Sequence, residues 1–270
     1  MPKLDAVVLA GGKVSEVLAQ VTGEEYEALI PIGSRPMVEY VVQALKESEN
    51  IGRIVVVGPP ELSEILPEDL CQVVESGPSL VDNLLRGLEV LGSEREVLVA
   101  SGDIPLLTTQ AVDDFLAQTR AVEADIYYPI ISRESNEARF PHVRRTYVRL
   151  REGVFTGGNL VLLDPECVYK CRQTIEQAVA MRKKPWQLAR LLGFRFILKL
   201  LFNRLNLKEI EERVQLILGF VGKGIISYSP EIGIDVDKPS DLELVRAKLA
   251  GDFQIKENVK TESAPGTIDA

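Results

Sequence analysis

Short β-branched runs alternate with amphipathic patterns through the first half of the chain. Runs typical of buried strands lie at residues 6–10, 53–57, 72–74, 97–100 and 125–131. Patterns with apolar residues at three- and four-residue spacing, which predict helices, lie between them at residues 37–47, 79–91 and 111–122. Such alternation requires crossover connections, so it favours a mostly parallel sheet covered on both faces by helices. We expect a three-layer α/β/α fold.

The regular alternation of strand-like and helix-like patterns ends in the second half of the sequence. Residues 146–151 alternate polar and apolar side chains as a half-exposed strand would, and residues 153–163 carry a Gly157-Gly158 turn. The chain then reads as helical to about residue 219, followed by strands at 224–228 and 232–236 and a helix at 240–249. Beyond Gly251 the composition is polar and patternless. We expect an α/β domain of residues 1–164 and 221–250, a helical insertion at 165–220 and a disordered tail at 251–270.

The expected insertion contains an unusually apolar stretch, residues 188–202. Charges at Arg190, Arg195 and Lys199 interrupt it, whereas a membrane span needs roughly 20 residues with few or no charges. It is nevertheless too apolar for a helix with one buried face, so something must cover it. The candidates are the insertion's own neighbouring helices, a second subunit in a homodimer, and a lipid-like acceptor or membrane surface. The apolar residues are Leu191, Leu192, Phe194, Phe196, Ile197, Leu198, Leu200, Leu201 and Phe202.

Composition excludes several classes of protein. A net charge of −9 argues against a general nucleic-acid binder. His142 is the only histidine, which argues against zinc hydrolases and histidine-based triads. The three cysteines, Cys71, Cys167 and Cys171, form no disulfide framework, and the N-terminus has no signal-peptide layout. We expect a cytoplasmic protein.

Small and acidic residues stand at three expected strand ends, where open α/β sheets bind ligands. The first run ends in Leu9-Ala10-Gly11-Gly12, the fourth leads into Ser101-Gly102-Asp103-Ile104-Pro105, and Asp235 and Asp237 alternate near the end of the domain. Paired glycines let the backbone approach a phosphate or base, and aspartates are ligands that Mg²⁺ prefers. The third glycine of the dinucleotide fingerprint is missing, which disfavours nicotinamide and flavin cofactors. The pattern indicates a nucleotide site with Mg²⁺ on Asp103, Asp235 and Asp237.

These motifs, together with residues 29–40 (LIPIGSRPMVEY) and 235–242 (DVDKPSDL), resemble nucleotidyltransferases of the molybdenum cofactor guanylyltransferase type. The resemblance covers about residues 4–130 and 224–250. It implies a Rossmann-like sheet of the glycosyltransferase-A kind and transfer from a nucleoside triphosphate to a phosphorylated or alcohol-bearing small-molecule acceptor, with release of pyrophosphate. It also implies that the glycine loop lines the nucleotide and that Asp103 holds Mg²⁺. The expected nucleotide contacts are Leu9, Ala10, Gly11, Gly12, Lys13, Ser101, Gly102 and Asp103.

The chain departs from the family pattern at two positions. Glu16 and Glu27 stand where the family usually has an arginine and a lysine that neutralise the triphosphate. Arginines concentrated at residues 133–151 are candidate replacements, because guanidinium groups bind phosphate in bidentate fashion; a solvated strand face explains them equally well. We assign Arg144 and Arg145 to catalysis. The expected acceptor contacts are Arg139, Arg149, Thr156, Gly157, Gly158 and Asn159.

The favoured function is therefore a Mg²⁺-dependent nucleotidyltransferase. Two alternatives stay open: a glycosyltransferase that uses a nucleotide sugar on the same scaffold, and a nucleotide-binding or regulatory protein that has lost catalysis, which Glu16 and Glu27 make credible.

Overall fold

The computed structural model describes residues 2–141, 143–181, 196, 199 and 202–262. Most of the apolar stretch 188–202, along with His142 and the last eight residues, lies outside the described residues. No helix of the described part is long and apolar enough to cross a membrane.

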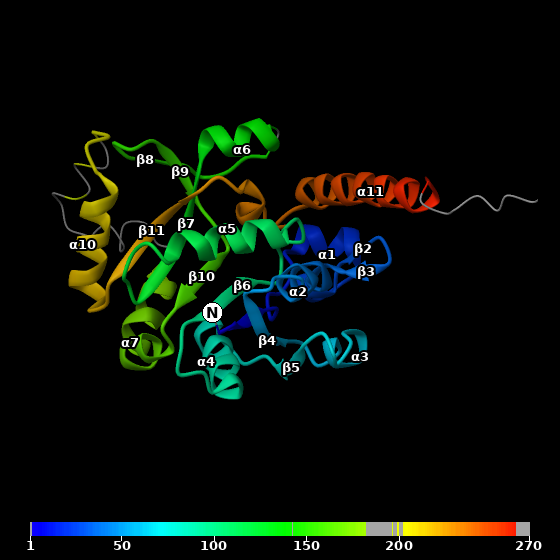
Figure 1. The fold of residues 1–270 in the computed structure, drawn as a ribbon, viewed down its shortest axis with the longest axis horizontal. Helices are drawn as coiled ribbons and strands as arrows, with labels where there is room; N and C mark the ends of the chain where they lie inside the picture. The colour runs from blue at the N-terminus through cyan, green and yellow to red at the C-terminus, as the bar shows by residue number, and fades with distance from the viewer. Residues whose placement is uncertain (1, 142, 182–195, 197–198, 200–201, 263–270) are drawn as a thin grey trace, which may run out of the picture.

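The first half of the chain forms the expected alternation (Figure 1). Its elements are β1 (Leu4–Leu9), α1 (Glu16–Thr22), η1 (Glu27–Leu29), β2 (Pro31–Ile32), β3 (Arg35–Pro36), α2 (Met37–Lys46), β4 (Ile51–Gly58), α3 (Leu62–Ile65), β5 (Gln72–Glu75), α4 (Leu80–Leu91), β6 (Val97–Ser101) and α5 (Thr109–Thr119). The second half contains β7 (Ile126–Ser132), α6 (Arg133–Arg139), β8 (Val148–Arg149), β9 (Val154–Gly157), β10 (Leu160–Leu163), α7 (Pro165–Met181), α10 (Leu207–Leu218), β11 (Gly222–Ser227), η2 (Pro230–Gly233) and α11 (Pro239–Glu262).

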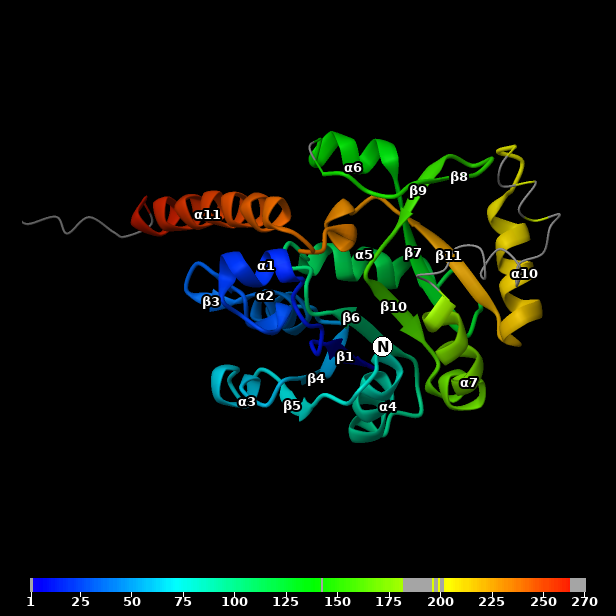
Figure 2. The ribbon, with the colours of Figure 1, turned by 180° about the vertical axis from the view of Figure 1, so that it is seen from behind.

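The described residues build one nine-stranded sheet in the order β5-β4-β1-β6-β10-β7-β9-β8, with β11 also paired to β7. The strands β5, β4, β1 and β6 are parallel, β10 runs antiparallel to β6 and β7, and β11 is parallel to β7. This mostly parallel α/β sheet confirms the predicted Rossmann-like fold. Figures 1 and 2 both place α10 and α11 at opposite ends of the molecule.

Alternate side chains of β1 enter different halves of the core. Ala6 and Val8 pack with α2 and α5 on one face of the sheet, whereas Val7 packs with α4 and α7 on the other. Both faces of the strand are therefore buried, which explains why the sequence of a central parallel strand is continuously apolar.

Three boundaries differ from those predicted. The predicted strand at residues 232–236 is wrong: this segment begins in η2 and then bonds to neighbouring loops, through Asn159 N to Ile232 O (2.9 Å) and Val236 N to Asp103 O (3.0 Å). Pro230 begins the turn of η2, which extends into the first residues of the predicted strand. The strand predicted at 146–151 is reduced to β8. Helix α11 continues to Glu262, so residues 251–262 are helical rather than tail; a polar stretch without proline is compatible with a helix. The division into domain and insertion stays a prediction.

A glycine sets how closely α4 approaches β1. A Cβ on Gly87 would lie 2.6 Å from Val7 Cγ1 and 2.9 Å from Val7 Cγ2. We expect Gly87→Ala to lower the free energy of unfolding by about 1–3 kcal/mol, because overpacking outweighs the gain in helix propensity. Urea unfolding measures the change. The control is Gly251→Ala, where nothing lies within 4 Å and only the propensity gain should appear; equal midpoints for both variants would contradict this packing.

Candidate functional site

Two neighbouring strand ends bring the glycine loops together. Strands β1 and β6 pair with Leu9 opposite Ser101, and Gly102 N donates to Leu9 O at 2.9 Å. A Cβ on Gly102 would lie only 3.2 Å from the Cα of Ala10, so the two loops pack backbone against backbone. Leu9 to Gly12 and Ser101 to Asp103 therefore share one edge of the sheet, as the sequence predicts.

Three aspartates meet beside these loops. Carboxylate oxygens of Asp103, Asp235 and Asp237 all lie within 4.8 Å of one another. The hydrogen bond from Val236 N to Asp103 O ties the two segments together, and Ser15 Oγ donates to Asp237 O at 3.2 Å. Apolar packing of Ile234 and Val236 against α1 and α11 holds the second segment in place. The fold thus brings together the three candidate metal ligands.

Asp103 is the most constrained member of this cluster. Its Oδ1 is buried and has no hydrogen-bond partner among the residues that the structure describes. Burial raises the pKa of the Asp103 carboxyl to about 6, and the neighbouring charges of Asp235 and Asp237 add to the shift. A buried carboxylate oxygen without a partner is costly unless a cation or donor meets it. With three hard oxygen donors converging, these residues fit a hard divalent cation.

Two of the four arginines predicted to bind phosphate or acceptor form ion pairs with acidic residues near the site. Arg145 is largely buried and forms an ion pair with Asp235, while its buried Nε has no hydrogen-bond partner within the described part of the chain. Arg139 pairs with the buried Glu231 at 3.3 Å, in the turn that precedes the aspartates. Arg144 and Arg149 are exposed. Arg145 is therefore the arginine that the structure joins directly to the carboxylate cluster.

The Thr156–Asn159 turn lies next to the same sheet edge. Asn159 O accepts from Ser101 N (3.0 Å), Asn159 N donates to Ile232 O (2.9 Å), and Gly158 N donates to Pro129 O (2.9 Å). A Cβ on Gly157 would overlap the hydroxyl of Tyr128. The glycines thus permit a close turn between the Asp103 loop and the segment that carries Asp235.

The side chain of Lys13 contacts Glu25 and Tyr26 rather than the aspartate cluster. Its ammonium pairs with Glu25 at 2.8 Å in an exposed position and lies 5.7 Å from the ring centre of Tyr26. Its assignment to nucleotide binding stays a prediction.

Asn83 is a site residue that the motifs do not indicate. Its Oδ1 accepts from Gly77 N at 2.6 Å, and a Cβ on Gly11 would lie 2.8 Å from its Nδ2. Asn83 is buried on α4 among apolar residues. A polar residue on the buried face of an amphipathic helix is the signal that could have identified it.

Glu27 faces the glycine loop. Its backbone N donates to Gly12 O at 3.0 Å, and a Cβ on Gly12 would lie 2.5 Å from its Oε2. Burial raises the pKa of Glu27 to about 8, with further contributions from Asp103, Asp237 and Asp235. Most Glu27 side chains are therefore protonated at neutral pH in the metal-free protein, which removes much of the repulsion that a second carboxylate beside the triphosphate would cause.

This shift predicts a pH dependence of stability. Glu27 titrates near 4.5 in an unfolded chain and near 8 in the folded one, so the folded state keeps its proton where the unfolded state has lost it. Stability of the metal-free protein should fall as pH rises from about 4.5 to about 8. Glu27→Gln should remove part of this decline and melt about 2–4 °C above wild type at pH 8.5. Thermal melts in EDTA across this pH range measure the difference. Parallel curves of melting temperature against pH for wild type and Glu27→Gln would contradict the raised pKa of Glu27.

Comparisons with known proteins agree with the fold and identify the family. The chain is 44% identical to a solved structure from Thermus thermophilus described as a hypothetical transferase, with a TM-score of 0.80, covering 89% of this chain and 100% of that one. A 2-C-methyl-D-erythritol 4-phosphate cytidylyltransferase structure, also from Thermus thermophilus, is 17% identical with a TM-score of 0.53. It covers 91% of this chain and 98% of that one and shows the fold alone.

A curated relative matches a shorter part of the chain. It is the 2-C-methyl-D-erythritol 4-phosphate cytidylyltransferase of Clostridium perfringens, 26% identical over 128 residues, which are 44% of this chain and 55% of the relative. The chain thus spans about half the length of the curated relatives that it matches first. The model of the MobA-like NTP transferase domain matches residues 6–190 and confirms the resemblance drawn from the sequence motifs. Because that model spans well over half of the sequence, the chain belongs to the family of MobA-like NTP transferase domains.

Proposed function

We propose that this chain transfers a nucleotidyl group from a nucleoside triphosphate to a phosphorylated or alcohol-bearing acceptor and releases pyrophosphate. The observation that carries the proposal is the buried, unpartnered Oδ1 of Asp103 within the aspartate cluster, directly beside the two glycine loops. Family membership and the similarity to named nucleotidyltransferases support it. The three free cysteines support a reducing, cytoplasmic setting.

Asp103, Asp235 and Asp237 would hold Mg²⁺. When bound, Mg²⁺ neutralises phosphate charge and fixes the orientation of the triphosphate. The backbone of the Gly11-Gly12 loop would contact the nucleotide, and Asn83 would keep that loop in position through its contacts with Gly77 and Gly11.

The reaction needs no base from the protein when the acceptor is a phosphate. An acceptor oxygen attacks the α-phosphorus and forms a new P–O bond. The bond from the α-phosphorus to the oxygen that bridges to the β-phosphate breaks, and its electron pair leaves with pyrophosphate. Arg145 would bind phosphate oxygens through the exposed part of its guanidinium, and Thr156 and Asn159 would contact the acceptor. An alcohol acceptor would release its proton to water.

A thermal-shift screen tests this proposal against its two rivals. The four nucleoside triphosphates and a set of nucleotide sugars are compared with Mg²⁺ and with EDTA, since a ligand that binds the folded state raises the melting temperature. We expect stabilisation by one or two triphosphates and only with Mg²⁺. Stabilisation and turnover of nucleotide sugars would favour a glycosyltransferase, and binding without turnover of any acceptor would favour a regulatory protein.

A further inference from the structure

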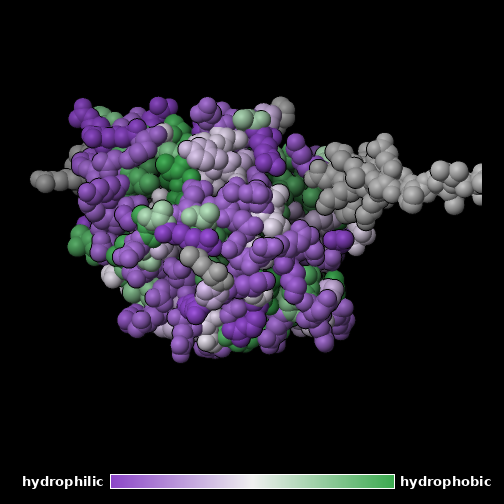
Figure 3. All heavy atoms as spheres, in the orientation of Figure 1, coloured by the Kyte–Doolittle hydropathy of each residue, from purple (hydrophilic) through white to green (hydrophobic). Residues whose placement is uncertain are grey.

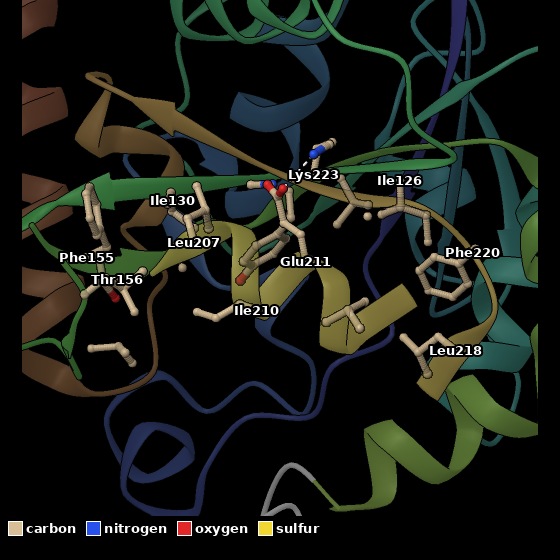
Figure 4. A pocket seen from close by; sticks show the side chains of 18 residues that line it. Ile126, Ile130, Phe155, Thr156, Leu207, Ile210, Glu211, Leu218, Phe220 and Lys223 are labelled. Carbon is tan, nitrogen blue, oxygen red and sulfur yellow. Dashed lines mark hydrogen bonds and ion pairs between the residues drawn. The ribbon is translucent and has the colours of Figure 1, made fainter. Parts of the chain in front are cut away.

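A cavity of about 550 Å³ lies between α10 and the strands β7, β9 and β11. Almost all of the described side chains that line it are apolar. Figure 4 shows Phe155 and Thr156 at one end, Leu218 and Phe220 at the other, and Glu211 and Lys223 between them. The volume falls in the range of roughly 300–1,000 Å³ typical of small-molecule sites.

Helix α10 is shaped to cover this space. Leu207, Ile210, Val214 and Leu218 stand on one face of the helix and line the cavity. The helix has well-formed ends, a capping box at Asn206 and a left-handed Gly219, yet the described part of the chain fully buries none of its residues. Neighbouring apolar side chains bury these four residues only in part, so the rest of this apolar face is exposed to the cavity.

The two charged side chains within the cavity pair with each other. Lys223 pairs with Glu211 at 2.6 Å, and Glu211 Oε1 accepts from Gly224 N at 3.1 Å. The alkyl chain of a ligand could therefore lie beside these charged groups without breaking their ion pair or hydrogen bond. A hydrophilic ligand would find few free groups among the described lining residues.

The Thr156 end of the cavity leads to the aspartate cluster. Gly157 lines the cavity, and a Cβ on Gly233 would lie 3.5 Å from Gly157 O and 3.9 Å from Arg145 Nη2. Tyr128 also lines the cavity; burial raises the pKa of its phenol, and Arg145 and Asp235 are close enough to act on it electrostatically. One end of the apolar space thus lies within a side chain's length of the proposed site of transfer.

The cavity also reaches the surface. Tyr128 and Val148 line it and are 41% and 42% exposed. Figure 3 shows hydrophobic residues in green on the surface around β8, β9 and α10. An alkyl chain could enter from this side along apolar side chains.

We infer that the acceptor is an amphiphile: a phosphate or hydroxyl head beside Arg145 and Thr156, with an alkyl or isoprenoid chain in the cavity. This inference rests on the proposed function, because the head group is the proposed nucleophile. The apolar lining, the apolar face of α10 and the proximity of Arg145 to Gly157 each point to the same occupant.

Calorimetric titration of the full chain with ethyl, hexyl and decyl phosphate, below their micelle concentrations and with Mg²⁺ present, tests the inference. Each methylene that enters the cavity should tighten binding about fourfold, so decyl phosphate should bind at least about 100-fold more tightly than ethyl phosphate. Equal affinity across the series would overturn the inference.

A pair of tryptophan variants on α10 tests whether the alkyl chain of the ligand occupies the cavity. Val214→Trp fills the cavity and should reduce the decyl preference at least about tenfold, while Gln215→Trp, at the exposed neighbouring position, should leave it unchanged. Thermal melts confirm folding. A decyl preference untouched by Val214→Trp, or a dimer that this variant dissociates in sedimentation, would overturn the inference and, in the second case, assign the cavity to a second copy.

The two proposals fail differently. If the wild-type protein shows no Mg²⁺-dependent triphosphate binding, the proposed function is wrong. If triphosphate binding is intact but the length of the alkyl chain has no effect on the affinity for alkyl phosphates, only the inference of an amphiphilic acceptor is wrong.

Discussion

Replacing Asp103 by Asn should abolish Mg²⁺-dependent stabilisation by nucleoside triphosphate and lower turnover on the order of 10³-fold or more. Asparagine keeps the shape of the side chain but removes the charge that a hard cation requires, and a loss of about 4 kcal/mol of transition-state stabilisation corresponds to this factor. Isothermal titration with Mg²⁺ and triphosphate, together with pyrophosphate release, measures the two effects.

The same substitution should stabilise the metal-free protein above pH 7. Burial raises the pKa of the Asp103 carboxyl to about 6, so the wild-type protein carries a buried charge there that the variant lacks. The control is Asp164→Asn, where the side chain accepts from Glu166 N at 2.8 Å at the start of α7 and asparagine can do the same. Unchanged Mg²⁺ dependence in Asp103→Asn would contradict the metal assignment.

Arg145→Ala should lower kcat/KM by about 10²–10³-fold while tightening the affinity for Mg²⁺. The guanidinium pairs with Asp235, so its removal takes a cation away from the reacting phosphates and frees a carboxylate for the metal. The metal-free variant should lose about 3–5 kcal/mol of stability, because a largely buried charge is left unpaired, and Mg²⁺ should restore much of it.

Arg145→Lys is the matched control, since it keeps the charge but not the fork of donors. Its activity should lie between those of the wild type and Arg145→Ala, with Mg²⁺ affinity close to wild type. If Arg145→Ala weakens Mg²⁺ binding instead, Arg145 organises the metal ligands rather than competing with the metal for Asp235.

The sequence predicts the sheet and one edge of the site because both depend on local patterns. Alternating strands and helices determine the parallel core, and the glycine loops follow strands whose ends must meet. The meeting of Asp103 with Asp235 and Asp237 is also predicted, but through a strand that does not form: η2 and backbone bonds to neighbouring loops hold the second segment.

Other features depend on contacts between distant residues. The protonation of Glu27 arises from burial beside three aspartates, and the position of Asn83 follows from how α4 lies against the glycine loop. The cavity depends on the distance between α10 and the sheet, for which an amphipathic pattern gives no measure. The difference between the largely buried Arg145 and the exposed Arg139, Arg144 and Arg149 likewise requires the path of the chain between α6 and β9.

Pyrophosphate release tests the central claim most directly. The wild-type chain is mixed with Mg²⁺, with the triphosphate that the thermal-shift screen selects, and in turn with phosphorylated and alcohol-bearing acceptors that include decyl phosphate. The account predicts one pyrophosphate for each nucleotidyl group transferred, none in EDTA and none above background with Asp103→Asn. Pyrophosphate release that persists without Mg²⁺ or with Asp103→Asn, or triphosphate binding with no pyrophosphate from any acceptor, would contradict it.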